Sequence, residues 1–144
     1  MGLLDFIYRQ KFPGLLSAQG PFSQVAYQRD ENERRYNPES NASDGPVKGP
    51  GYFGALVRPD GQGLMTEYGV GMEILGKEME IPTLVPTLSP EEVMAILKAK
   101  EGEKLPNSIY RKAAQFAQQR VARGLSPWAG PHEEGQYFNL LRGK

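Results

Sequence analysis

The stretch LMTEYGVGMEILGKEMEIPTL, residues 64–84, decides the fold of this chain. Polar and apolar residues alternate over residues 64–74, the pattern of an antiparallel strand with one buried face and one face in water. Leu75-Gly76 predicts a tight turn, and a second strand follows over residues 77–84. Pro82 lacks a backbone amide proton, so we expect this strand to lie at a sheet edge or to end there.

A further strand and a turn precede this pair. Residues 52–58 (YFGALVR) are strand-like, with apolar side chains on one face. Residues 59–63 (PDGQG) supply a turn, because proline fixes φ and glycine tolerates positive φ. Three strands joined by short turns make an antiparallel meander, which is the sheet that the sequence predicts.

Two helices are predicted after the strands. The first has Ser89 as its N-cap, Pro90 at its first position and Glu92 closing a capping box, and it runs to about Lys100. The second, over residues 106–124, carries apolar side chains at helical spacing and ends at a glycine. A small sheet needs a helix layer to be stable, so the predicted fold is α+β, with two helices packed on the meander.

Composition divides the chain into four parts. Residues 51–130 form the α+β core module, residues 1–18 an apolar docking segment, residues 19–50 a polar, extended arm or linker, and residues 131–144 a short tail. A short helix over about residues 22–34 is compatible with the arm sequence. The remainder of the arm is dense in turn-forming residues and buries too little apolar surface to order itself, which suggests that neighbouring molecules hold it.

Apolar residues near the two ends are candidate partner-docking residues. The helix expected over residues 2–10 is too short to be stable alone in water, so it must dock on its own core or on a partner. A second short helix is expected around residues 136–141. The candidate docking residues are Leu3, Leu4, Phe6, Ile7, Tyr137, Phe138, Leu140 and Leu141.

Composition also excludes several classes of function. Lys and Arg number 17, as do Asp and Glu, so the formal net charge of zero predicts no specific attraction to nucleic acid or to an anionic membrane. The chain has no cysteine, which excludes disulfides, thiolate metal sites and cysteine nucleophiles. No apolar run approaches the roughly 18–20 residues that cross a bilayer, so no transmembrane segment is expected.

The residues that could carry chemistry each have a simpler explanation. His132 is the only histidine and cannot complete a metal site alone. Glu78 and Glu80 fit the wet face of a strand, and Asp60 lies in a turn that lacks the other ligands of a calcium loop. Residues 69–71 (GVG) lie inside a strand, where they predict close approach of another backbone or ring rather than nucleotide binding. We therefore expect no catalytic, cofactor or metal site.

Two stretches of the core module resemble a known family. They are GYFGALVRPDGQGLMTEYGVGMEILGKEMEIPTLVPTLSPEEV (residues 51–93) and SIYRKAAQFAQQRVARGLSPWAG (residues 108–130). The segments RPDG, TEY, GKE and IPTLVP within the first stretch, and GLSPW in the second, are the most telling. In these residues the chain resembles a small module of internal or tail-associated virion proteins of tailed bacteriophages.

This resemblance implies a minor structural or assembly protein and no enzyme. The expected partners are other phage structural proteins (portal, tail or internal proteins) in a symmetric multi-copy assembly. The expected location is the virion, assembled in the host cytoplasm, either at the tail or head–tail junction or as an internal ejected protein.

Two alternatives stay open at the level of sequence. The protein could be a phage-encoded host-interaction or regulatory protein that acts free in the infected cell. It could also be an accessory wall-binding module of a lytic enzyme, although the chain carries no lytic domain of its own. Presence in purified particles distinguishes the virion protein from the first, and binding to peptidoglycan distinguishes it from the second.

Overall fold

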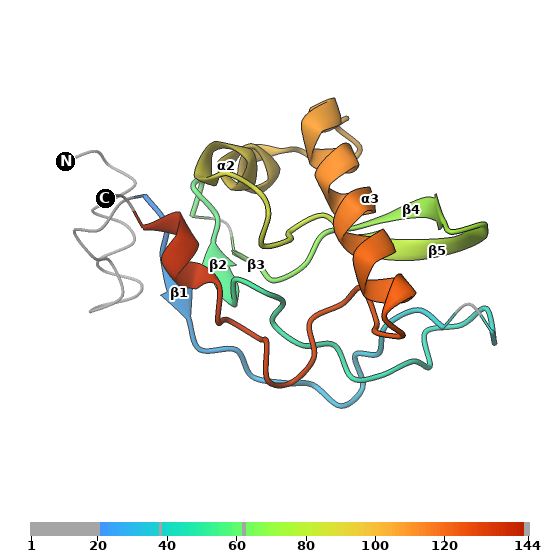
Figure 1. The fold of residues 1–144 in the computed structure, drawn as a ribbon. Helices are drawn as coiled ribbons and strands as arrows, with labels where there is room; N and C mark the ends of the chain where they lie inside the picture. Colours follow the sequence, from blue (N-terminus) through green and yellow to red (C-terminus); the bar gives the residue numbers. More distant parts are fainter. Residues whose placement is uncertain (1–20, 38, 62, 143–144) are drawn as a thin grey trace.

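The computed structural model describes residues 21–37, 39–61 and 63–142, and Figure 1 shows how their elements are arranged. The predicted α+β class is confirmed, with a small three-stranded antiparallel sheet and two helices. The remaining two strands form a separate two-stranded sheet. In chain order the elements are β1 (Gln24–Val25), β2 (Ala55–Val57), β3 (Leu64–Met65), β4 (Gly69–Ile74), β5 (Lys77–Pro82), α2 (Pro90–Lys98), α3 (Asn107–Ala122) and the 3-10 helix η1 (Phe138–Leu141).

The membership of the three-stranded sheet differs from the prediction. Its order is β1-β2-β3, so the third strand comes from the arm and not from residues 77–84. The strand expected over residues 64–74 is interrupted at residues 66–68, and its two halves lie in different sheets. At this interruption the Tyr68 carbonyl accepts hydrogen bonds from the backbone and the hydroxyl of Thr83, at 2.8 and 2.7 Å. These bonds extend the β4–β5 pairing by one residue pair beyond Gly69 and Pro82.

Strands β4 and β5 form a hairpin that packs under α3. The predicted turn is confirmed, with Leu75 at φ 51° and Gly76 at φ 83°, the backbone of a type I′ turn. Ile74 and Ile81 from the hairpin are buried against Ala113 and Ala117 of α3. Figure 1 shows α3 crossing the hairpin, whose tip projects beyond it.

Helix α2 begins as its capping signals predict. The Glu92 backbone N–H donates to Ser89 Oγ at 3.2 Å, and the Ser89 backbone N–H donates to Glu92 Oε1 at 2.9 Å. Three of its residues, Val93, Ile96 and Leu97, are buried in the main core. The helix ends at Lys98, close to the predicted end, because the Ala99 N–H caps the Ile96 carbonyl in a tighter turn.

The arm is packed on the core more closely than its composition indicates. The helix compatible with residues 22–34 does not form; Phe22 and Ser23 are buried, and β1 follows them. Pairing with β2 explains this, since it ties Gln24 and Val25 into the sheet. Residues 28–37 and 39–49 are irregular, and bridges between Arg34 and Val47 and between Asn37 and Ala42 link the two stretches.

The tail also belongs to the core. The Gly135 and Tyr137 backbone N–H groups donate to the carbonyls of Gly51 and Tyr52, at 2.9 and 3.1 Å. Leu141 lies in the same buried cluster as Phe22. Residues on both sides of the compositional limits at residues 50 and 130 therefore share one buried cluster. Within the described ranges, no helix is both long enough and apolar enough to cross a membrane.

Candidate interaction surfaces

Trp128 lies in a loop that α3 positions. Arg120, in the last turn of α3, donates to the backbone carbonyls of Ser126 and Trp128 at 2.8 and 3.1 Å. Its guanidinium also holds Glu133 through two bonds of 2.6 and 2.9 Å. The Arg120 hydrogen bonds lower the pKa of Glu133, so this pair stays ionised. Arg120 thus fixes the loop, and with it the only tryptophan of the chain.

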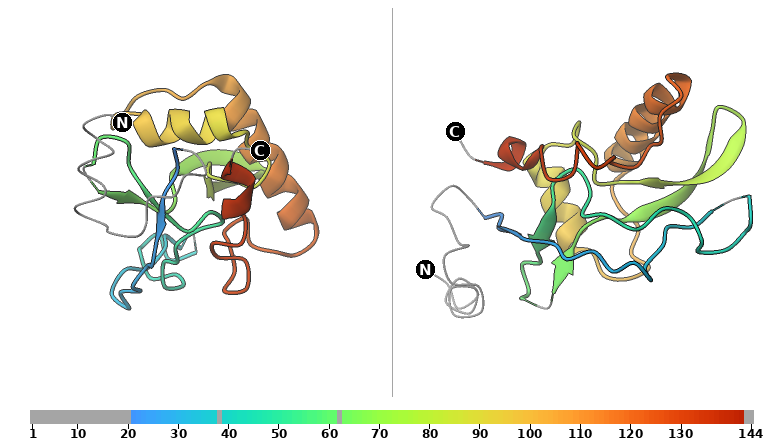
Figure 2. Two further views of the ribbon diagram at one scale, coloured as in Figure 1. Left: turned by 90° about the vertical axis from the view of Figure 1, so that its left-hand side faces the viewer. Right: turned by 90° about the horizontal axis from the view of Figure 1, so that it is seen from below.

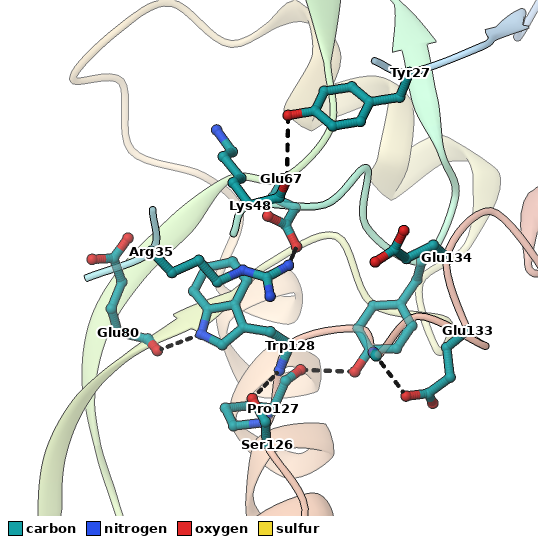
Figure 3. Close-up of polar contacts among 12 residues, drawn as sticks. Tyr27, Arg35, Lys48, Glu67, Glu80, Ser126, Pro127, Trp128, Glu133 and Glu134 are labelled. Carbon is teal, nitrogen blue, oxygen red and sulfur yellow. Dashed lines mark hydrogen bonds and ion pairs between the residues drawn. The ribbon is translucent and has the colours of Figure 1, made fainter. Parts of the chain in front are cut away.

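The Trp128 ring is held between the arm and β5 (Figure 3). Its Nε1–H donates to the Glu80 carbonyl at 3.2 Å. On the arm side, the Arg35 guanidinium carbon lies 5.1 Å from the centre of the indole ring, a cation–π geometry. Three distant parts of the sequence therefore meet at one aromatic ring.

Arg35 also carries the most buried ion pair among the described residues. Its Nη2 lies 2.5 Å from Glu67 Oε2, and the two side chains are only 14% and 5% exposed. Burial raises the pKa of Glu67, although Arg35 opposes that effect. Arg35 Nε and Glu67 Oε1 are buried without a hydrogen-bond partner. The pair is therefore incompletely satisfied, and it anchors the arm at the interruption between β3 and β4.

An open groove lies beside this anchor. It has a volume of about 370 Å³ and runs between the arm, β5 and the loop after α3. Its walls are mainly apolar and include Tyr36, Pro46, Met79, Pro127 and Trp128. A smaller and more polar pocket of about 250 Å³ continues from it past Arg34 and Lys48. We call the larger space the arm groove.

The outer edge of β5 borders the arm groove. In the described part of the chain β5 pairs with β4 alone. In a two-residue hairpin the pair flanking the turn is hydrogen-bonded, here Ile74 with Lys77, and alternate positions beyond it turn their backbone groups outward. Glu78 and Glu80 occupy those outward positions. The bond from Trp128 to the Glu80 carbonyl is consistent with this orientation.

A second apolar pocket lies at the opposite end of the molecule. It has a volume of about 470 Å³ and is formed where the start of β1, the first turns of α2 and the end of η1 meet. We call it the end pocket. Its lining residues are Pro21, Phe22, Pro90, Glu91, Met94, Leu141 and Arg142.

The predicted docking residues fall into three groups. Leu3, Leu4, Phe6 and Ile7 lie outside the described residues. Tyr137, Phe138 and Leu141 pack on the chain's own core: Leu141 is buried, and the Tyr137 ring meets Tyr52 edge-on, with 5.9 Å between ring centres. Leu140 is 51% exposed. Of the described candidates, Leu140 is thus the one that projects from the surface.

The structure also shows the surroundings of the histidine and of the two strand glycines considered from the sequence. His132 is exposed, and within the described ranges no three His, Asp or Glu side chains gather where they could hold a metal ion. Another backbone or ring was expected over Gly69 and Gly71. Instead the Glu80 side chain covers Gly69, and the space above Gly71 is open.

Sequence reasoning did not identify Arg35 or Glu67 as a buried pair. Arg35 lies in a charged run that reads as a solvated surface, and Glu67 occupies a polar position of an alternating strand. The one available signal was the lone Trp128 in a Ser-Pro-Trp loop, because a loop tryptophan needs a packing partner.

Comparisons with family models, with curated proteins and with solved structures found no match for this chain.

Proposed function

We propose that this chain is a minor structural or assembly protein of a tailed-phage virion, and that it acts by binding other proteins rather than by catalysis. The resemblance of residues 51–130 to phage virion modules supports the phage context. The observation that carries the mode of action is the arm groove, an open apolar channel beside the outer edge of β5, which pairs with no second strand in the described chain.

The chemistry of the arm groove suits an extended protein segment. Tryptophan, tyrosine and methionine are enriched in the buried centres of protein interfaces, and Trp128, Tyr36 and Met79 line this groove together. The outward backbone groups of Glu78, and the Glu80 N–H beside the carbonyl that Trp128 already bonds, can hydrogen-bond an added strand. A segment of a neighbouring protein laid along β5 would cover apolar surface and satisfy the strand edge at once.

The proposed neighbours are portal, tail or internal proteins of the particle. A symmetric assembly in many copies, at the tail or head–tail junction or inside the particle, would present such segments at a fixed spacing. Zero formal net charge favours close association over repulsion between copies.

Quantitative mass spectrometry of purified particles tests the location. We expect the protein at a fixed copy number that matches the symmetry of a tail, portal or internal assembly. Absence from particles, with the protein free in the infected cell, would refute the proposal in favour of a host-interaction protein. Retention on purified peptidoglycan without incorporation would instead indicate a wall-binding module.

A matched pair of variants tests the arm groove. Tyr36 lines the groove and is 43% exposed, whereas Leu125 is 47% exposed and does not line it. We expect Tyr36→Ser to lower the copy number in particles several-fold and Leu125→Ser to leave it unchanged. Equal incorporation of both variants would show that the groove does not hold the protein in the particle.

A further inference from the structure

Leu75 at the hairpin tip is unexplained by the fold. It is 61% exposed, the largest exposed fraction among the exposed large hydrophobic residues of the described chain. Its φ of 51° is a left-handed conformation that the first position of a type I′ turn requires and that Asn, Asp or Gly adopts more easily. Neither turn chemistry nor core packing therefore accounts for a leucine here. A contact with another molecule would account for it.

The end pocket is apolar and large enough to receive such a side chain. Phe22, Met94 and Leu141 form apolar walls around about 470 Å³, which is ample for a leucine side chain. Glu91 and Arg142 are also in its lining and supply one charge of each sign. Burying Leu75 among these walls would remove apolar surface from water on both sides of the contact.

The hairpin tip and the end pocket face opposite ways. Figure 1 and the right-hand view of Figure 2 place the β4–β5 tip at one end of the molecule, and η1 with the start of β1 at the other. One molecule therefore cannot place Leu75 in its own end pocket, whereas a second copy can. A pair of surfaces at opposite ends defines a head-to-tail contact, which repeats into a ring or an open filament.

Charge favours the same pairing. Glu73 and Glu78 lie directly opposite each other near the tip, a like-charge pair that destabilises an isolated hairpin. Arg142 of a second copy's end pocket can neutralise them, and Lys77 beside the turn can meet Glu91. The hairpin tip and the end pocket thus each carry both positive and negative charges that can pair with opposite charges on the other surface.

We propose that Leu75 of one copy inserts into the end pocket of the next, so that this protein assembles head to tail. The inference rests on the proposed function, because it names a second copy of the chain as one of the partners in the multi-copy assembly.

Sedimentation velocity of the purified full-length chain tests the contact. We expect the wild-type protein to form larger species as its concentration rises. Leu75→Asn and Met94→Glu should each weaken association at least tenfold, while the control Leu125→Asn, also at an exposed leucine, should behave like wild type. Circular dichroism establishes that each variant is folded, and Arg142→Glu serves as a second, surface variant of the end pocket that should also weaken association.

Mixing the two variants gives the sharpest result. Leu75→Asn retains its end pocket and Met94→Glu retains Leu75, so the mixture should form a one-to-one dimer and no larger species. A wild-type chain that stays monomeric at the highest concentration reached, folded variants that associate like wild type, or a mixture without dimers would each overturn the inference. Association that appears only after removal of residues 1–18 would also overturn it, because the chain's own segment would then fill the pocket.

These outcomes are separable from the particle experiment. A monomeric protein found in virions at fixed copy number would refute the head-to-tail contact alone. A protein that assembles in solution but is missing from virions would refute the proposed function alone.

Discussion

Leu75 is the residue at which local preference and the observed structure disagree most clearly. Its left-handed backbone carries a cost that an L-residue with a bulky side chain cannot relieve. Leu75→Asn should therefore raise the free energy of unfolding by about 0.5–1 kcal/mol, because Asn-Gly is the preferred type I′ pair. Urea denaturation monitored by circular dichroism measures this.

The neighbouring glycine is the internal control. Gly76 has a φ of 83° and open space around it, so Gly76→Ala adds strain without a clash. We expect it to lower the free energy of unfolding by about 1 kcal/mol. A destabilised Leu75→Asn variant would show that Leu75 is held by contacts within the chain.

Glu92 gives the fold a predictable dependence on pH. Burial alone would raise its pKa, but hydrogen bonds from Lys112, Ser89 and Ser108 outweigh burial and lower it from 4.5 to about 2. A lowered pKa in the folded state contributes stability that is present above pH 4.5 and is lost as the pH falls toward 2.

Glu92→Gln removes this contribution. The variant should lose about 1–3 kcal/mol near neutral pH, and its deficit should shrink as the pH falls from 4.5 toward 2. Unfolding curves for both proteins at several pH values measure the difference. A deficit that stays constant with pH would show that the capping geometry matters and the charge does not.

At the scale of elements, the arm depends on a buried ion pair. Arg35→Ala leaves the Glu67 carboxylate buried without its partner, so we expect a loss of about 3 kcal/mol near neutral pH. The pKa of Glu67 is already raised by burial and should rise further in the variant. Because protonated Glu67 tolerates burial, the loss should be smaller in acid than at neutral pH.

A double variant isolates the cause. Arg35→Ala with Glu67→Ala removes both charges, so it should recover a large part of the stability lost by the single variant. Thermal and urea unfolding of the three proteins measure this recovery. If the double variant is as unstable as the sum of the two single changes, the arm is held by packing and not by the ion pair.

The elements that could be predicted are those whose signals are local. Helix α2 follows from Ser89, Pro90 and Glu92, and the hairpin follows from alternation around Leu75-Gly76. The sheet membership of β1 could not be predicted, because a two-residue strand has no periodicity and depends on pairing with Ala55 and Leu56 far along the chain. At the interruption, residues 66–68, the partner of Glu67 is Arg35, which is equally distant in sequence.

The candidate site was less predictable for the same reason. The arm groove exists only because Tyr36, Met79 and Trp128 are brought together from three separate segments. No local pattern links those residues in the sequence. Leu140 was identified as a docking residue and is exposed, whereas its neighbour Leu141 faces the core, since the two lie on different sides of the single turn of η1.

At the scale of the whole molecule, the tail should contribute to stability. Leu141 is 2% exposed within the main buried cluster, so Leu141→Ala should cost about 2–4 kcal/mol. Leu140→Ala, at a residue 51% exposed, should change stability by no more than about 0.5 kcal/mol. Chemical unfolding of both variants measures the contrast. Equal effects would mean that the tail does not complete the core.

The meeting of Phe22 and Leu141 in one cluster also governs when folding can finish. A ribosome releases the chain from its N-terminal end, so Phe22 emerges long before its partner does. Helix α3 and the hairpin can form on the growing chain, but the main cluster stays open until Leu141 has left the exit tunnel. A nascent chain arrested before Leu141 emerges should therefore remain sensitive to protease.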